Sequence, residues 1–219
     1  MLNWERLYQD FSACVTDGDC ATLCCSDPQD IPACCNSERL ALVVFADELA
    51  WARSRTTCWH GRRPRTTKER CDVANWAEHV ALARCVHPRR CDRPHRSLTC
   101  RLFPLEPYLD REGRLVGLTY VAGAARICPL ISRQIELRQE FVDQSYLVWR
   151  EILAAFPEER TCYRNVSRRL RARLTKQGRT IRVFRPTLED PRALNGEAVA
   201  TTISAISGFR PPAFSGASL

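Results

Sequence analysis

The sequence of 219 residues has no run of 18 apolar residues and no basic start followed by an apolar stretch. It therefore predicts neither a membrane-spanning helix nor a secretory signal peptide. It also has no Walker loop, no GxGxxG, no HExxH and no CxxxCxxC. Nucleotide and dinucleotide binding, zinc hydrolase chemistry and the usual radical chemistry of S-adenosylmethionine are therefore not indicated. We expect a protein of the reducing cytoplasm.

Lysine is almost absent, since Lys68 and Lys176 are the only two among 33 basic residues, and the formal net charge is +8. Positive charge attracts nucleic acid, acidic peptides or phosphorylated ligands. However, a cubane cluster of charge +2 held by four thiolates carries about −2 overall. We therefore interpret many of the arginines as compensation for buried negative charge rather than as a nucleic-acid surface.

Cysteine, by contrast, is abundant, with thirteen residues in the chain. A chain of this length buries roughly 70% of its unfolded surface, so it does not need disulfides in order to fold. An odd number of cysteines also leaves one thiol unpaired in a pure disulfide scheme. Thiolate is the preferred ligand of iron–sulfur clusters and a common ligand of zinc. We interpret the cysteines as metal ligands, with a disulfide scaffold as the alternative.

The expected ligands fall into two groups, one near the N-terminus and one in the middle of the chain. Short spacings let several thiolates converge on a metal from one loop, so the two groups predict either two centres or one centre closed by both. Cys58, Cys71 and Cys162 are expected to be ordinary thiols, although Cys58 beside Trp59 and His60 is an alternative ligand. The predicted metal ligands are Cys14, Cys20, Cys24, Cys25, Cys34, Cys35, Cys85, Cys91, Cys100 and Cys128.

Residues 14–129 resemble the CxxCxxCC family of zinc- or iron-chelating proteins, the YkgJ-like cysteine-cluster proteins. The resemblance rests on a CC pair before the apolar stretch and acidic helix start at 40–48, and on two motifs of the second group. These motifs are Cys91-Asp92-Arg93-Pro94 and Cys100-Arg101-Leu102-Phe103-Pro104. Residues 11–25 are also similar to the cysteine box of flagellin lysine N-methylase, an iron–sulfur methyl-transfer enzyme.

Two residues of the second motif are expected to contact the cofactor. We expect Arg101 to hydrogen-bond backbone, a cluster sulfur or a carboxylate such as Glu48. Phe103, with Pro104, is expected to shield the metal from water. An iron–sulfur cluster is favoured over zinc, because zinc sites usually use paired short spacings such as CxxC, which do not occur here.

Three functions fit this interpretation. The favoured one is an iron–sulfur protein that acts in redox chemistry or modifies a peptide or protein. The alternatives are a non-catalytic zinc-binding structural or interaction module, and a nucleic-acid-binding protein that uses the arginine-rich segment 164–173. Aromatic residues are not interleaved with those arginines, which disfavours stacking on single strands. We expect the segment to serve an acidic peptide near the metal site, or else to pair with Glu136, Glu140 and Asp143.

The expected fold is mainly α with small β elements, an α+β fold with irregular cysteine-rich loops around one or two metal centres, packed on C-terminal helices. Residues 1–185 are expected to form a single domain, with a cysteine-rich part at 14–129, a helical part at 130–178, and a tail or surface-wrapping extension at 186–219. Periodicity and turn residues predict the individual elements. Helices are expected at 4–11, 46–55, 72–84, 131–156 and 158–176, a buried strand or helix start at 40–45, a strand at 115–121, and loops at 14–38, 58–71 and 85–107.

Overall fold

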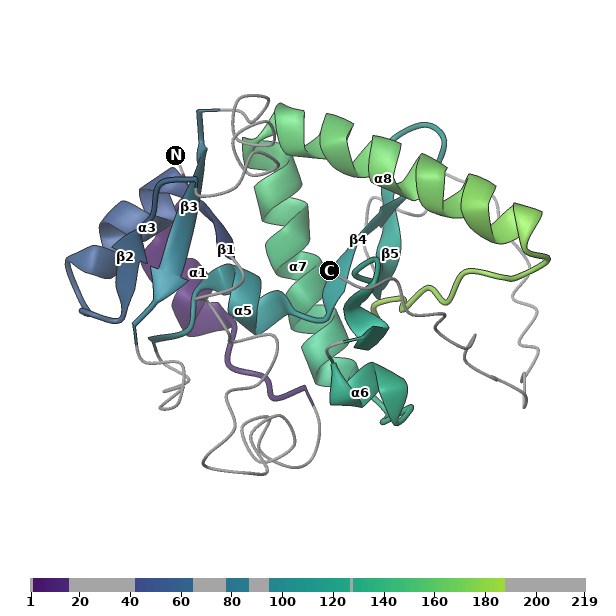
Figure 1. Cartoon of the computed structure of the whole chain (residues 1–219), viewed down its shortest axis with the longest axis horizontal. Coiled ribbons are helices and arrows are strands. Elements are labelled where there is room, and N and C mark those ends of the chain that lie inside the picture. Colours follow the sequence, from purple (N-terminus) through teal and green to yellow (C-terminus); the bar gives the residue numbers. More distant parts are fainter. Residues whose placement is uncertain (1, 16–41, 65–77, 87–94, 127, 188–219) are drawn as a thin grey trace, which may run out of the picture. The chain divides into compact units, whose positions relative to one another are not determined.

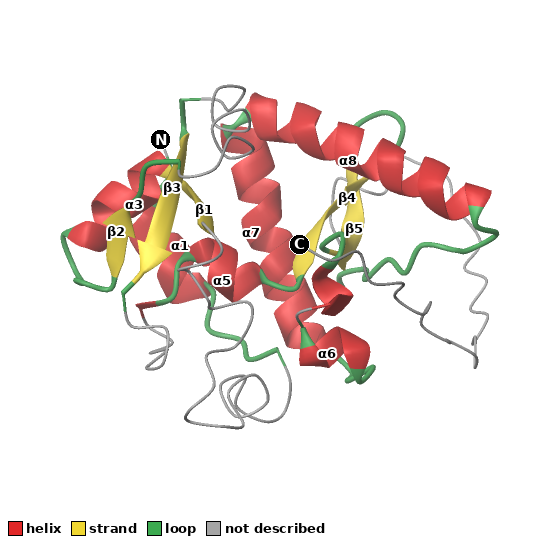
Figure 2. Cartoon of the chain, in the orientation of Figure 1, coloured by secondary structure: helices red, strands yellow, loops and turns green. Residues whose placement is uncertain are grey.

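The computed structural model describes residues 2–15, 42–64, 78–86, 95–126 and 128–187, which form a mainly helical α+β fold with two small antiparallel sheets (Figures 1 and 2). This is the fold class expected from the sequence. Met1–Leu188 form one compact unit, and a second unit, Glu189–Leu219, lies outside the described residues. The tail expected at 186–219 therefore falls outside the described residues from position 188 onward.

The first sheet has the strand order β1-β3-β2, with β1 at Leu42–Phe45, β2 at Trp59–Gly61 and β3 at Val80–Cys85. Helix α3 (Ala46–Arg53) follows β1 directly and contacts all three strands. The apolar segment expected at 40–45 is thus a strand in its described part, and the helix expected after it is confirmed. The sheet and α3 enclose a small buried cluster, hereafter the small cluster, formed by Val44, Ala52, Trp59 and Ala83.

The helix expected at 72–84 is wrong in its described part, because residues from Val80 onward form strand β3. A short apolar run does not distinguish helix from strand by its period alone. Here β3 lies between two strands, with Ala81 opposite Val44 and Ala83 opposite Gly61, so both of its edges are hydrogen-bonded. Pairing in the tertiary structure therefore decided the conformation. The loop expected at 58–71 likewise contains strand β2.

The second sheet is a hairpin of β4 (Leu105–Leu109) and β5 (Leu115–Tyr120). The two strands are joined by a turn in which the Asp110 carboxylate accepts from the Arg114 amide at 2.8 Å and Gly113 has a φ of +84°. A Cβ on Gly117 would lie only 2.7 Å from the Phe184 carbonyl oxygen, so glycine allows Phe184 to pair with β5. The loop expected at 85–107 is partly wrong, because it contains helix α5 (Leu98–Leu102) and most of β4.

The long helix expected at 131–156 is interrupted. Helix α6 covers Pro129–Ser132 and α7 covers Gln139–Ala155, and Gln134 between them has a φ of +55°. Tertiary contacts stabilise the break, since the Arg138 amide donates to the Val15 carbonyl at 2.9 Å. The last helix is confirmed: α8 covers Pro157–Lys176.

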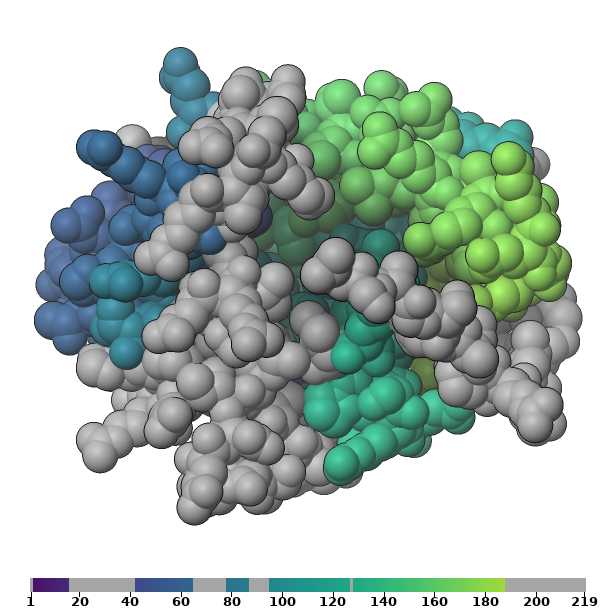
Figure 3. All heavy atoms as spheres, in the orientation of Figure 1, coloured from purple at the N-terminus to yellow at the C-terminus, as the bar shows by residue number. Residues whose placement is uncertain are grey.

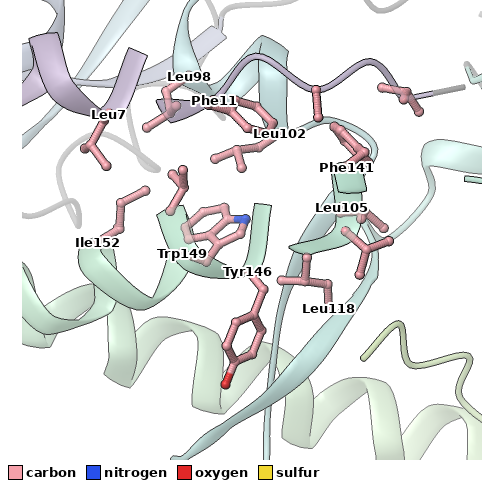
Figure 4. Close-up of a cluster of buried hydrophobic side chains, with 14 of the residues drawn as sticks. Leu7, Phe11, Leu98, Leu102, Leu105, Leu118, Phe141, Tyr146, Trp149 and Ile152 are labelled. Carbon is pink, nitrogen blue, oxygen red and sulfur yellow. The ribbon is translucent and has the colours of Figure 1, made fainter. Parts of the chain in front are cut away.

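The main core gathers around α7. Helix α1 (Trp4–Asp10) packs its apolar stripe into this core, as the sequence predicts, and α5, β4 and β5 supply further buried side chains. Trp149 of α7 meets Tyr163 of α8 edge to face at 5.0 Å between ring centroids. Figure 4 shows members of this core from α1, α5, α7 and the hairpin gathered together: Leu7, Phe11, Leu98, Leu102, Leu105, Leu118, Phe141, Tyr146, Trp149 and Ile152.

Candidate metal centre

Four of the predicted ligands belong to the described part of the chain: Cys14, Cys85, Cys100 and Cys128. The other six lie outside the described residues, and so does Cys71. Among the described residues, no three or more His, Cys, Asp and Glu side chains are grouped so that they could hold a metal ion. The predicted ligands outside the described residues are Cys20, Cys24, Cys25, Cys34, Cys35 and Cys91.

Cys14 is held against helix α7 by the backbone on either side of it. The amides of Ser12 and Ala13 both donate to the side-chain oxygen of Gln144, at 2.9 and 2.8 Å. On the other side of Cys14, the Val15 carbonyl accepts from the Arg138 amide at 2.9 Å. The start of the first cysteine group is therefore fixed to the N-terminal half of α7.

Cys100 lies in α5, whose N-cap is Ser97. The Ser97 hydroxyl accepts from the Cys100 amide at 3.3 Å, as an N-cap side chain does in the first turn of a helix. Cys100 is half-buried, and it also lies close enough to the Tyr8 hydroxyl to raise the pKa of that group. The cap and the buried neighbours Leu98 and Leu102 fix the position of this thiol.

Arg101 connects the two cysteine groups. Its Nη1 donates to the carbonyls of Tyr8 at 2.9 Å and of Phe11 at 3.0 Å, and its guanidinium lies 4.3 Å above the Tyr8 ring. Its Nε also donates to the Arg96 carbonyl at 3.3 Å. Arg101 therefore hydrogen-bonds to backbone, which is one of the partners expected for it. Arg101 directly follows Cys100, and Phe11 lies three residues before Cys14. The Arg101 side chain therefore joins the segment of Cys100 to the segment that leads into Cys14.

Glu48 is a buried carboxyl group beneath α5, with only 1% of its surface exposed. Its Oε1 accepts from the Tyr8 hydroxyl and from the Leu98 amide, both at 2.5 Å, while Oε2 has no hydrogen-bond partner among the described residues. Burial raises the pKa of Glu48, and its hydrogen bonds and Arg101 oppose that rise. Burial and the neighbouring Glu48 raise the pKa of Tyr8 as well. Glu48 thus joins α3 to α1 and to the first residue of α5.

Cys128 is the N-cap of α6 and is 2% exposed, within the main core. Burial raises the pKa of its thiol, while the nearby amides of Ile131 and Leu130 lower it. The surroundings of Cys128 are therefore compatible with a thiolate ligand, and equally with a buried thiol.

A second gathering of thiols surrounds the small cluster, against which Cys58, Cys85 and Cys100 all pack. Cys85 ends β3 opposite Trp59, and the Cys58 carbonyl accepts from the Val86 amide at 2.9 Å. Cys58 therefore lies beside a predicted ligand, although the sequence favours an ordinary thiol there. The signal that was missed is strand β2, which brings Cys58 to β3.

The remaining expectations have mixed outcomes. Phe103 is partly buried and packs against the main core, and Pro104 is fully buried. Whether they shield a metal stays a prediction. Cys162 is exposed on α8 and forms no disulfide. The sequence did not predict the roles of two further residues. Gln144 accepts from the amides that precede Cys14, and the Tyr8 hydroxyl donates to Glu48.

No family model, no curated protein and no solved structure matches this chain. The resemblance to cysteine-cluster proteins therefore stays an expectation drawn from the motifs. Within the described residues, no helix is long and apolar enough to cross a membrane.

Proposed function

We propose that this protein holds a metal centre through thiolates from both cysteine groups, and that the centre is an iron–sulfur cluster rather than zinc. The observation that carries the proposal is the placement of Arg101. Its hydrogen bonds to the Tyr8 and Phe11 carbonyls bind the helix of Cys100 to the segment that leads into Cys14. Thiols that are 86 positions apart in the sequence thus lie on segments that are joined by direct contacts.

The third described segment supports the same interpretation. Cys128 begins α6, and the chain after α6 returns to the first cysteine group through the bond from the Arg138 amide to the Val15 carbonyl. Cys14, Cys100 and Cys128 are therefore on three segments tied to one another by hydrogen bonds. In Figure 1, residues 11–15 run below α5 toward α6. A common centre would account for thiols on all three segments.

The surroundings of these thiols fit a centre that is partly shielded from water. Cys128 is buried, and Phe103 packs against the core one turn beyond Cys100. Apolar cover and hydrogen bonds to sulfur are the means by which a protein adjusts the potential of a cluster. We therefore favour a role in redox chemistry or in the modification of a peptide or protein substrate. Cytoplasmic location is part of the same proposal, since such thiols are maintained in reducing compartments.

The test is to purify the protein without oxygen and to measure iron, zinc and acid-labile sulfide per chain. Iron and sulfide in equal amounts, with the visible absorption of a cluster, are the expected result. Zinc without sulfide would instead support the second candidate function, a zinc-binding structural or interaction module. Protein with neither metal and with fully titratable thiols would overturn the proposal. Cys162→Ser is the matched control for Cys100→Ser, because Cys162 is exposed on α8.

A further inference from the structure

Helix α8 carries a dense set of positive charges on its outer surface. Most basic residues of its second half are exposed, in contrast to the residues that pack on α7 and β4. In Figure 3 this helix, coloured green to yellow-green, lies on the surface of the molecule. We call the following set the basic face of α8: Arg164, Arg168, Arg169, Arg173 and Lys176.

Other arginines of the same helix donate to backbone carbonyls of neighbouring segments. Arg160 donates to the carbonyls of Leu153 and Gly113 at 3.3 to 3.4 Å. Arg171 donates to the Leu109 carbonyl at 2.6 Å and lies 5.5 Å above the Tyr108 ring. Arg171 is thus half-buried, whereas Arg164 and Arg168 are exposed. The helix uses two of its arginines for packing and leaves the basic face outward.

The basic face lacks partners within the described part of the chain. Its four arginines make no ion pair or hydrogen bond there, although Arg173 is close enough to Glu106 to lower the pKa of that carboxyl. Two of the three carboxylates expected to neutralise them are engaged elsewhere. Glu140 pairs with Arg138 at 3.1 Å, and Asp143 accepts from the Thr187 amide at 2.9 Å. The intramolecular alternative is therefore not realised among these residues.

The spacing of the basic face forms two rows. Residues four apart lie on the same side of a helix, which places Arg164 with Arg168 and Arg169 with Arg173. The small residue Ala172 lies between the rows. Arg164 and Lys176 are twelve positions apart, about 18 Å along the axis, and five to six residues of an extended chain span roughly the same length.

We propose that the basic face of α8 docks a short acidic segment of a partner protein. Arginine binds carboxylates in a two-pronged geometry, so two rows of guanidinium groups suit alternating carboxylates on an extended peptide. In Figure 1, α8 runs along the top of the view, α6, whose N-cap is Cys128, lies at the bottom, and α5, which carries Cys100, lies between them. The docking surface is therefore on another element than Cys14, Cys100 and Cys128, and we infer that the partner binds away from these thiols rather than beside them.

An acidic peptide fits this face better than a nucleic acid does. Recognition of single strands uses aromatic rings that stack on bases. The rings nearest to the face are already engaged, Tyr108 under Arg171 and Tyr163 against Trp149.

The experiment uses the full chain and a fluorescein-labelled peptide of ten glutamates, with binding followed by fluorescence anisotropy. The test variant is Arg168→Glu/Arg169→Glu/Arg173→Glu. The control variant is Arg53→Glu/Arg133→Glu/Arg150→Glu, which changes the net charge equally at exposed arginines of other segments. Affinity is expected to fall at least about tenfold in the test variant and less than about threefold in the control.

Three outcomes would overturn the proposal: no binding by the wild type, equal losses in the two variants, or tighter binding of a ten-nucleotide thymidine strand through the same arginines. The last would establish a nucleic-acid surface instead. If the test variant does not fold by circular dichroism, Arg168→Gln/Arg169→Gln/Arg173→Gln replaces it, with the same expected direction. Metal content is measured in each variant and is expected to be unchanged, so this result is independent of the proposed metal centre.

Discussion

The two sheets of this protein are stabilised in different ways. The β4–β5 hairpin packs with α7 and α8 on the main core, which buries large side chains such as Phe141 and Ile152 completely. The three-stranded sheet contributes Phe45 to that core, and its own small cluster has four buried residues, against which three half-buried cysteines pack. Apolar burial scales with area, so the first region has far more of this stabilisation than the second. The three-stranded sheet depends on its ties to α1 and α5 and, in our proposal, on bound metal.

Loss of a metal ligand should have the largest effect. We expect Cys100→Ser to reduce the free energy of unfolding much more than Cys162→Ser, because metal-binding free energy is also folding free energy, about 10–16 kcal/mol for structural zinc in small peptides. Cys128→Ser should behave like Cys100→Ser. Urea unfolding of the anaerobically purified proteins, with metal content measured in parallel, is the check.

Removing the metal from all variants with a chelator provides the control for this difference. Without metal, the gap between Cys100→Ser and Cys162→Ser should shrink to the cost of packing alone. In the wild type, hydrogen exchange should then accelerate in β1 and β3 before it does in α7. Identical exchange in the two regions would show that the small cluster is sufficient without metal, which contradicts the comparison.

Truncation in the main core should come next. Phe141 is completely buried and lies 5.8 Å from the ring of Phe11, so Phe141→Ala is expected to cost about 3–5 kcal/mol. The matched change in the other region is Val44→Ala in the small cluster. It is expected to lower the free energy of unfolding by about 1–3 kcal/mol. Denaturant unfolding measures both. A larger cost for Val44→Ala would reverse the ranking of the two regions.

Stability is expected to depend on pH because of Glu106 in the hairpin. Burial raises the pKa of Glu106 from an ordinary value of 4.5 to about 7, although the Ala122 amide and Arg173 oppose this rise. The folded protein therefore binds a proton more tightly than the unfolded chain does, and stability is lost as the pH rises from about 4.5 to 7. A shift of this size corresponds to about 3 kcal/mol. Glu106→Gln should thus stabilise the protein at pH 8 and change little at pH 4.5. Parallel stability curves for the two proteins across this range would contradict the assignment.

The smallest effect is expected at the contact that holds Cys14. Gln144→Ala removes the acceptor of the Ser12 and Ala13 amides, at a cost of about 1 kcal/mol, because the segment is partly exposed to water. Gln144→Glu retains an acceptor at this position and is the control. Thermal unfolding of the two variants is the measurement, and an equal loss in both would show that this hydrogen bonding does not matter.

Much of the helical half of the fold could be predicted from local pattern. The stripe of α1, the run of α8 and the turn at Gly113 follow from residues that are close in sequence. The predictions failed where distant partners decided the conformation. β3 became a strand because β1 and β2 pair with both of its edges, and the helix at 131–156 broke where Arg138 bonds to Val15.

The candidate site divides in the same way. The cysteine groups and the motif around Arg101 were evident from spacing. The three backbone carbonyls that accept from Arg101 were not, because every residue has a carbonyl and only the fold selects those within reach. The approach of Cys58 to Cys85 required strand β2. The role of Glu48 as a buried acceptor required three elements to meet around it.

The sequence by itself determined the α+β composition, the two cysteine groups and the strongly basic last helix, since each of these depends on residue type and local period. Only the tertiary structure decided which arginines of α8 face solvent and which segments Arg101 joins. Those outcomes depend on how helices and strands pack against one another, and packing joins residues that no local pattern connects.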